Sequence, residues 1–235
     1  MRRVLIGTLT YDGKLPIEWF NSYLRSQSYL LEKNIAISPV MIKGEHFIDR
    51  GRNDILHLAR ENEFDDLVYI DSDIIWEEED LYKLLSHSVD CVSATYRRKS
   101  IEETYPLKFR KNGEGSERLS YSDSLKLWKV FGVPAGFLRL SAKAIDRLWD
   151  KCDRYVEERG DSRSGERAMA FSTSICSKTQ TYISEDIGFC FNWMEKCNQD
   201  LWLDSTIKLI HQGELNYSGD PSDWINQVID KYELN

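Results

Sequence analysis

The sequence has no long apolar run and no cysteine pattern typical of a metal site. Its five cysteines include no Cys-x-x-Cys pair, and an odd number without ligand spacing favours reduced thiols in a cytosolic setting. No stretch approaches the ~20 apolar residues of a membrane helix. The apolar N-terminal run turns polar at Thr8, too early for a signal peptide. We therefore expect a soluble, cytoplasmic protein without a membrane span.

A surplus of positive charge is also missing. The chain carries 31 Lys and Arg against 39 Asp and Glu, a net charge of −8. Such a protein is poorly suited to hold long nucleic acid by phosphate contacts alone. Residues 97–111 are the exception, with six basic and two acidic side chains, a local charge of +4. A patch of this kind is usually solvated surface, but it would also suit an acidic acceptor.

The remaining composition indicates one large α/β domain over residues 1–235. Apolar residues make up 41% of the 235 residues, enough for a substantial core. Strand-like and helix-like segments alternate, which favours a mainly parallel sheet with helices on both faces. The expected strands are 3–9, 35–42, 66–70 and 89–96, and the expected helices begin at Pro16, Asp49 and Glu77.

Apolar spacing predicts which helix faces are buried. Ile17, Phe20, Leu24 and Leu31 recur at helical spacing after Pro16. In the helix that we expect Asp49 to cap and that runs to about Glu63, the inward residues are Ile55, Leu56 and Ala59.

The second half of the chain changes character. Residues 105–141 contain short strand-like pieces and turn signals, which predict a small antiparallel insert. A helix is expected over 141–152 and another over 184–197, capped by Ser184. Residues 157–180 are polar and irregular, and we expect a flexible loop there. Short closing strands are expected at 201–204 and 207–211.

Two carboxylates follow the third expected strand, in "LVYIDSDIIWEEED". Strands of a doubly wound sheet end at the crevice where ligands bind, so Asp71 and Asp73 are expected to point into a pocket. On an extended chain, residues i and i+2 lie on one side. A divalent cation would relieve their repulsion, because hard cations prefer oxygen ligands. The alternative is that the two residues only cap the next turn and helix.

The order of several blocks resembles the GT-A glycosyltransferases. Asp71-Ser72-Asp73 resembles their Asp-x-Asp signature, within a helix–strand–helix block over 50–85. The segments 89–99, 133–148 and 182–214 are similar to the next strand with its basic end, the Gly-Phe strand, and the late Ser-Glu-Asp helix with a histidine strand. The likeness spans most of 3–220 and is greatest to small glycosyltransferases of bacteriophages and large viruses. It implies a GT-A fold and, for a viral protein, the host cytoplasm.

The resemblance also implies a site. Mn²⁺ or Mg²⁺ would be held by Asp73, His211 and Asp71, although Asp71 could face the donor ribose or sugar instead. Asp186 would be the general base in an inverting enzyme, with Glu185 as a second acid. The nucleotide-sugar donor, most simply a UDP-sugar, would meet a set of residues near the strand ends: Thr8, Thr10, Tyr11, Asp12, Arg52, Asn53, Ser72 and Lys99.

The same residues also have purely structural explanations. Ser184, Glu185 and Asp186 also form an ordinary helix start. Arg52 could make a surface ion pair, and His211 could be an inert strand-end histidine. The expected activity is sugar transfer to a hydroxyl acceptor, a glycan or another acceptor. The alternatives are a phage enzyme that modifies DNA bases, a nucleotidyltransferase of the same general fold, and an inactive sugar-nucleotide-binding protein.

Overall fold

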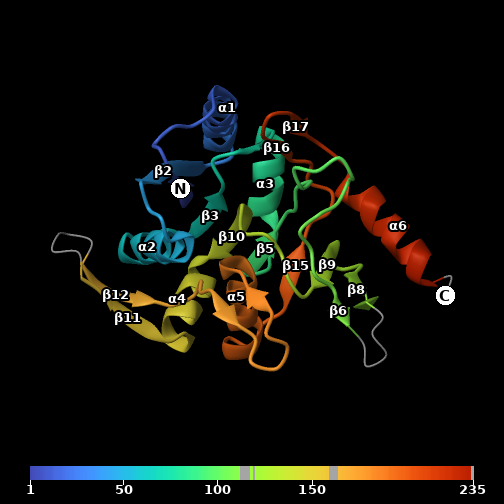
Figure 1. Cartoon of the computed structure of the whole chain (residues 1–235). Coiled ribbons are helices and arrows are strands. Elements are labelled where there is room, and N and C mark those ends of the chain that lie inside the picture. Colours follow the sequence, from blue (N-terminus) through green and yellow to red (C-terminus); the bar gives the residue numbers. More distant parts are fainter. Residues whose placement is uncertain (112–116, 119, 159–163, 234–235) are drawn as a thin grey trace.

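An eight-stranded sheet forms the centre of the molecule (Figure 1). The computed structural model describes residues 1–111, 117–118, 120–158 and 164–233. The strands follow the order β2 (Ile35–Lys43), β1 (Arg2–Thr10), β3 (Asp66–Ile70), β10 (Phe137–Ser141), β5 (Cys91–Ser93), β15 (Leu201–Leu203), β9 (Leu127–Val130) and β8 (Ser120–Ser122). All of them run in one direction except β10 and β9, so the sheet is mainly parallel.

Helices cover both faces of the sheet. One face carries α1 (Ile17–Glu32) and α3 (Glu78–Ser86), and the other carries α2 (Ile48–Glu61), α4 (Ala142–Lys151) and α5 (Glu185–Phe191). The π-helix η1 (Asn192–Lys196) continues α5, and α6 (Pro221–Glu233) lies near the C-terminus.

Strand alternation divides the core into two clusters. In β3, Val68 packs with the α1 and α3 side of the sheet, whereas Leu67 and Tyr69 pack with the α2 and α4 side. The expected inward residues of α2, Ile55 and Leu56, are fully buried. The expected α/β class with a mainly parallel sheet is therefore confirmed.

Smaller groups of two or three strands lie outside the central sheet. β4 (Ile74–Ile75) pairs with β16 (Ile210–Gln212), which also pairs with β17 (Asn216–Tyr217). Three two-stranded pairs complete the set: β6 (Arg110–Lys111) with β7 (Glu117–Arg118), β11 (Arg154–Glu157) with β12 (Gly165–Ala168), and β13 (Ser174–Ile175) with β14 (Tyr182–Ile183).

The antiparallel part of the chain belongs largely to the central sheet, and only β6 and β7 form a pair of their own within it. β10 lies between β3 and β5, and β8 and β9 extend the far edge of the same sheet. Residues 157–180, expected to be irregular, contribute to β11 and contain β12 and β13, while 159–163 lie outside the described residues. Their flexibility stays a prediction. Of the strand expected at 207–211, only Ile210 and His211 are paired.

Two expected details of the helices are wrong. Asp49 does not cap α2: Phe47 holds the N-cap position, and the Asp49 carboxylate accepts from the backbone N–H of Arg50. In α1 the expected inward residues face outward, and they are 43–63% exposed. The buried face holds Trp19, Ser22, Tyr23, Ser26 and Leu30.

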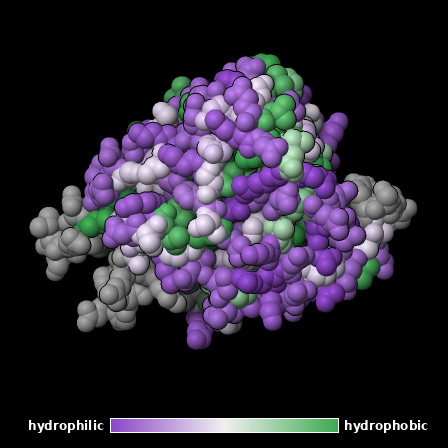
Figure 2. All heavy atoms as spheres, turned by 180° about the vertical axis from the view of Figure 1, so that it is seen from behind, coloured by the Kyte–Doolittle hydropathy of each residue, from purple (hydrophilic) through white to green (hydrophobic). Residues whose placement is uncertain are grey.

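Trp76 explains why this face of α1 is the buried one. Trp76, which follows β4, donates its indole N–H to Ser26 Oγ and packs edge-on against Trp19. Small serines let the helix approach that indole, so Ser22 and Ser26 lie on the buried face together with Leu30. Figure 2 shows hydrophobic patches near the top of the molecule, the region of α1 in Figure 1. Within the described part of the chain, no helix combines the length and apolar character that a membrane crossing requires.

Two leucines of α1 test this orientation. Leu30 is fully buried and Leu24 is 43% exposed. We expect Leu30→Ala to lower the free energy of unfolding by about 2–5 kcal/mol, the usual cost of emptying a core site. Leu24→Ala should cost less than about 1 kcal/mol, because little apolar area is uncovered. Urea denaturation of both variants measures the difference, and equal losses would contradict the orientation.

Candidate functional site

A turn separates the two carboxylates of the Asp-x-Asp segment. The backbone N–H of Ile74 donates to the carbonyl oxygen of Asp71 at 3.1 Å, which closes a turn over 71–74. The side chains therefore do not lie on one side of an extended strand, as the sequence had led us to expect. Asp71 and Asp73 have different partners, and the site has two halves.

In the first half, His211 lies beside Asp73. The chain after the turn forms β4, in which Ile74 pairs directly with His211 of β16. The backbone N–H of Gln212 also donates to the Asp73 carbonyl oxygen at 2.8 Å. This pairing places His211 Nε2 at 3.3 Å from Asp73 Oδ2, across 138 residues of sequence.

A lysine shares the same carboxylate oxygen. Lys99 Nζ lies 2.6 Å from Asp73 Oδ2. Burial alone would raise the pKa of Asp73, but the hydrogen bonds from His211 and Lys99 outweigh it and lower that pKa to about 2. Asp73 is therefore ionised at any pH that a folded protein meets in the cell.

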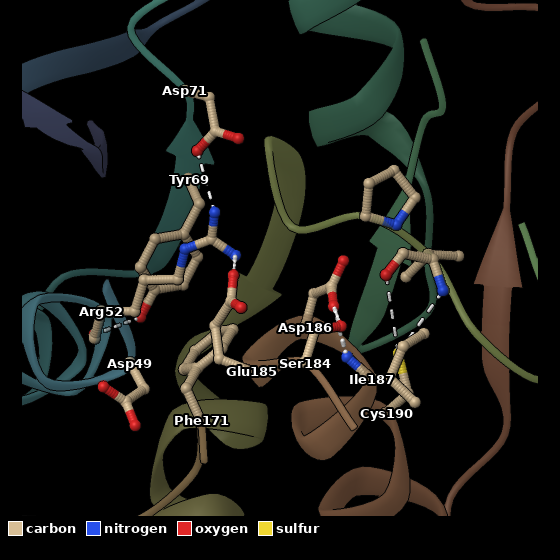
Figure 3. Close-up of polar contacts among 12 residues, drawn as sticks. Asp49, Arg52, Tyr69, Asp71, Phe171, Ser184, Glu185, Asp186, Ile187 and Cys190 are labelled. Carbon is tan, nitrogen blue, oxygen red and sulfur yellow. Dashed lines mark hydrogen bonds and ion pairs between the residues drawn. The ribbon is translucent and has the colours of Figure 1, made fainter. Parts of the chain in front are cut away.

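The second half centres on a buried guanidinium, that of Arg52 from the second turn of α2. Arg52 Nη2 donates to Asp71 Oδ1 at 2.9 Å, and Nη1 lies 3.4 Å from Glu185 Oε1 (Figure 3). Burial alone would lower the pKa of Arg52, but Asp71 and Glu185 outweigh it and raise that pKa. For Glu185 burial dominates and raises its pKa, while Arg52 opposes the rise.

Phe171 and Tyr69 fix the position of Arg52. The guanidinium carbon lies 5.6 Å from the centre of the Phe171 ring, a cation–π distance. The Tyr69 hydroxyl donates to the Arg52 carbonyl oxygen at 2.8 Å. Arg52 is thus an internal counter-ion rather than the surface ion pair considered from the sequence.

Tyr96 joins the two halves. Its hydroxyl lies 3.4 Å from Asp71 Oδ2, and its ring packs edge-on against His211 at 4.8 Å between centroids. Burial and then the charge of Asp71 raise the pKa of Tyr96 well above its ordinary value, so the hydroxyl stays a donor. A β-carbon at Gly136 would lie 2.5 Å from both Asp71 Oδ2 and the Tyr96 hydroxyl. Glycine at position 136 is what lets them meet.

Helix α5 brings the remaining acids. Ser184 precedes it, as expected, but its hydroxyl donates to Asp186 Oδ1 instead of accepting from the helix backbone. Asp186 Oδ1 also accepts from the N–H of Ile187 at 2.7 Å. Figure 3 shows Asp186 and Glu185 side by side at the helix start, on the side facing Asp71. Gly188 allows the helix to sit against Ser172, whose carbonyl oxygen would be 2.0 Å from an added β-carbon.

Other expected donor residues are less central. Thr8 and Thr10 are buried at the end of β1, whereas Tyr11 is 75% exposed beside His46. The backbone N–H of Lys14 donates to Asp12 and lowers its pKa. The Asn53 amide exchanges hydrogen bonds of 2.9 Å with the backbone of Phe171. Asn53 therefore positions the strand connection after β12, and Ser72 occupies the turn between the two aspartates.

Asp73 and His211 bring together an oxygen and a nitrogen of the kinds that bind divalent cations. His211 Nδ1 donates to the Arg97 carbonyl oxygen at 2.9 Å, which fixes the ring orientation and directs Nε2 at Asp73. The ammonium of Lys99 lies at the same carboxylate oxygen. Within the described ranges, no three His, Cys, Asp or Glu groups are gathered closely enough to hold a metal. Asp71 is held by Arg52, so the protein ligands nearest to each other are Asp73 and His211.

Sequence reasoning missed Tyr69 and Phe171, which hold Arg52, and also Tyr96, Gly136 and Arg97. Tyr96 ends the "SATY" segment, and Gly136 sits in "AGF", so both lay within blocks that drew attention for other reasons. Arg97 acts through its carbonyl oxygen, which composition does not reveal. The sequence feature that could have pointed to such residues is a polar or small residue at the end of a strand.

Comparisons with known proteins support the fold. No family model and no curated protein matches the chain. A197 from STIV matches with a TM-score of 0.52 at 15% identity, covering 94% of this chain and 91% of that one. A Drosophila β-1,4-galactosyltransferase 7 mutant with manganese, UDP-Gal and xylobiose matches with a TM-score of 0.45 at 10% identity, covering 94% and 71%.

A further similarity is to a glycosyltransferase involved in glycosylation of the major capsid of PBCV-1, with a TM-score of 0.33 at 10% identity, covering 63% of this chain and 65% of that one. The match to A197 from STIV supports the expected α/β fold. Likeness at this identity carries the fold alone, so the activity has to be argued from the site.

Removal of Arg52 tests the second half of the site. Arg52→Met would leave Asp71 and Glu185 without their shared counter-ion, and we expect a loss of about 3–5 kcal/mol in unfolding free energy. Arg154, whose ion pair with Glu166 is 43% and 50% exposed, supplies the control: Arg154→Met should cost less than about 1 kcal/mol. Adding Glu185→Gln to Arg52→Met should restore part of the loss, as judged by urea denaturation. A double variant no more stable than Arg52→Met would argue against a charge effect.

Proposed function

We propose that this protein is a metal-dependent glycosyltransferase that moves a sugar from a UDP-sugar to a hydroxyl acceptor. The observation that carries the proposal is the position of Arg52 between Asp71 and Glu185. This one guanidinium joins the Asp-x-Asp turn, the expected donor side, to the start of α5, the expected acceptor side. Donor phosphate and acceptor hydroxyl would meet between them.

The donor side is built for a diphosphate. When bound by Asp73 and His211, a Mn²⁺ or Mg²⁺ would stabilise the negative charge that grows on the leaving diphosphate. An imidazole among oxygen ligands favours Mn²⁺. Asp71, held by Arg52 and Tyr96, is oriented to accept from a sugar or ribose hydroxyl. Its immobility would serve positioning, since the groups that hold it are themselves buried.

The acceptor side supplies a base. Asp186 Oδ1 is taken by Ser184 and Ile187, so Oδ2 is the oxygen left to face an acceptor. In an inverting transfer the acceptor oxygen bonds to the anomeric carbon as the bond to the diphosphate breaks. The hydroxyl proton passes to Asp186.

A glycan suits the acceptor position better than DNA. A cavity of about 410 Å³ borders this side, lined by Asn53, Phe171 and Ser172 and by the aromatic rings of Phe47 and Tyr155, among others. Rings of this kind can cover the apolar face of a sugar.

The basic stretch 97–111 was the reason to consider DNA as an acceptor. Several of its basic side chains bind groups of this same chain. Arg97 donates to the carbonyl oxygens of Ile101 and Ser218, and Lys99 pairs with Asp73. The side chains of Arg110 and Lys111 lie outside the described residues. Fewer of these charges are therefore available to phosphates than the sequence suggested.

Calorimetry with UDP tests the donor side. We expect wild-type protein to bind UDP more tightly with Mn²⁺ than without it. Asp73→Ala should bind UDP weakly and without response to Mn²⁺, because it loses the carboxylate that anchors the ion. Asp146, 64% exposed on α4, provides the matched control: Asp146→Ala should behave as wild type. Unchanged Mn²⁺-dependent affinity in Asp73→Ala would refute the metal assignment.

Asp186→Asn tests the base. Asparagine keeps the shape and can still accept from Ser184 and Ile187, but it cannot take a proton. We expect turnover to fall by about 10²–10⁴-fold, the usual contribution of a general base, with UDP affinity nearly unchanged. A variant that folds poorly would make Asp186 a structural cap. A variant with normal turnover would place the base elsewhere or indicate retention of configuration, and anomeric analysis of the product by NMR separates those two results.

A further inference from the structure

Lys99 occupies the carboxylate that a metal ion would need. Its ammonium lies 2.6 Å from Asp73 Oδ2, the same oxygen that faces His211 Nε2 at 3.3 Å. The pair is open to solvent, with side-chain exposures of 36% for Lys99 and 37% for Asp73. The ammonium of Lys99 therefore lies where the two candidate metal ligands, Asp73 and His211, meet.

The surrounding loop directs Lys99 to this place. Arg97 holds the turn at 97–101 by donating to the carbonyl oxygens of Ser100 and Ile101 at 3.2 and 2.7 Å. It also reaches the carbonyl oxygen of Ser218 at 3.2 Å, beyond β17. The lysine stem passes over Gly213, where a β-carbon would lie 3.1 Å from Lys99 Cδ. The loop and the β16–β17 connection together guide the stem to Asp73.

We propose that Lys99 is a displaceable internal cation: it neutralises Asp73 when no divalent ion is bound, leaves when the ion binds, and then pairs with the donor diphosphate. The inference rests on the proposed function, because it assigns the metal to Asp73 and His211. It goes further by giving one side chain two alternative positions. Lys99 thereby couples metal binding to donor binding.

Charge and flexibility make the exchange feasible. An ammonium and a divalent cation cannot share one carboxylate oxygen without strong repulsion. A half-exposed lysine–carboxylate pair contributes little free energy, so its loss costs a bound ion only a small factor in affinity. Lysine carries a point charge on a flexible four-carbon stem, which can swing to a nearby phosphate without backbone movement. The ion would thus release the group that helps bind the next ligand.

Lysine acylation measures the displacement directly. Lys129 is the matched control, because its pair with Asp200 has similar exposures of 37% and 49% and lies outside the site. With an amine-acylating reagent and mass spectrometry, we expect Mn²⁺ alone to speed modification of Lys99 several-fold and to leave Lys129 unchanged. UDP added with Mn²⁺ should slow Lys99 again. If bound Mn²⁺ leaves the Lys99 rate unaltered or lowers it, the displacement is refuted.

Metal binding without nucleotide gives a second readout. Lys99→Met keeps the stem and removes the charge. By paramagnetic resonance of free Mn²⁺, we expect this variant to bind Mn²⁺ about two- to fivefold more tightly than wild type, the range expected for removing a half-exposed competing ion pair. Its affinity for UDP in the presence of Mn²⁺ should fall. Lys129→Met should match wild type in both measurements.

The outcomes separate this inference from the proposed function. If wild type and Lys99→Met both fail to bind Mn²⁺, the metal site of the proposed function falls and the inference falls with it. If both bind Mn²⁺ equally and UDP equally, the metal site stands and the role of Lys99 is refuted. Tighter Mn²⁺ binding with weaker UDP binding in Lys99→Met, together with acylation released by Mn²⁺, supports it.

Discussion

The buried guanidinium of Arg52 is the contact on which the site depends. It neutralises Asp71 at the end of β3 and Glu185 at the start of α5, and its own backbone belongs to α2. Two partly buried carboxylates on either side of one group would repel each other without a shared cation. Arginine suits the position because its rigid fork can address two acids at once and it stays charged when buried. Three distant segments are thereby joined at one charge.

The short strand pair β4–β16 positions the other half of the site. β4 has only the two residues Ile74 and Ile75, yet its pairing with β16 sets His211 beside Asp73. Tyr96 then spans the halves, with its ring on His211 and its hydroxyl near Asp71. A small displacement of this ladder would move His211 relative to Asp73, whereas a change in Arg52 would release Asp71. The two halves are joined by the turn over residues 71–74 and by Tyr96.

Local pattern was sufficient for the parts of the fold that are local. Strand and helix alternation predicted β1 to α3, and Asp73 and His211, which the sequence linked only through the resemblance, lie side by side. Pattern failed where long-range contacts decide. The aliphatic spacing of Leu24 and Leu31 pointed to the wrong face of α1, because Trp76 selects the serine face by its bond to Ser26. The turn at Asp71 and the partners of Arg52 depend on tertiary contacts that no window of sequence contains.

The charges in the site explain why a divalent ion is physically reasonable there. Asp71, Asp73, Glu185 and Asp186 contribute four negative charges, and Arg52 and Lys99 contribute two positive ones, so the sum is −4 + 2 = −2. A diphosphate donor would add further negative charge to this surface. On the proposed function, a divalent cation at Asp73 would restore the balance before the donor arrives. It would also free Lys99, whose stem is flexible, to face the phosphates, while Arg52 stays between Asp71 and Glu185.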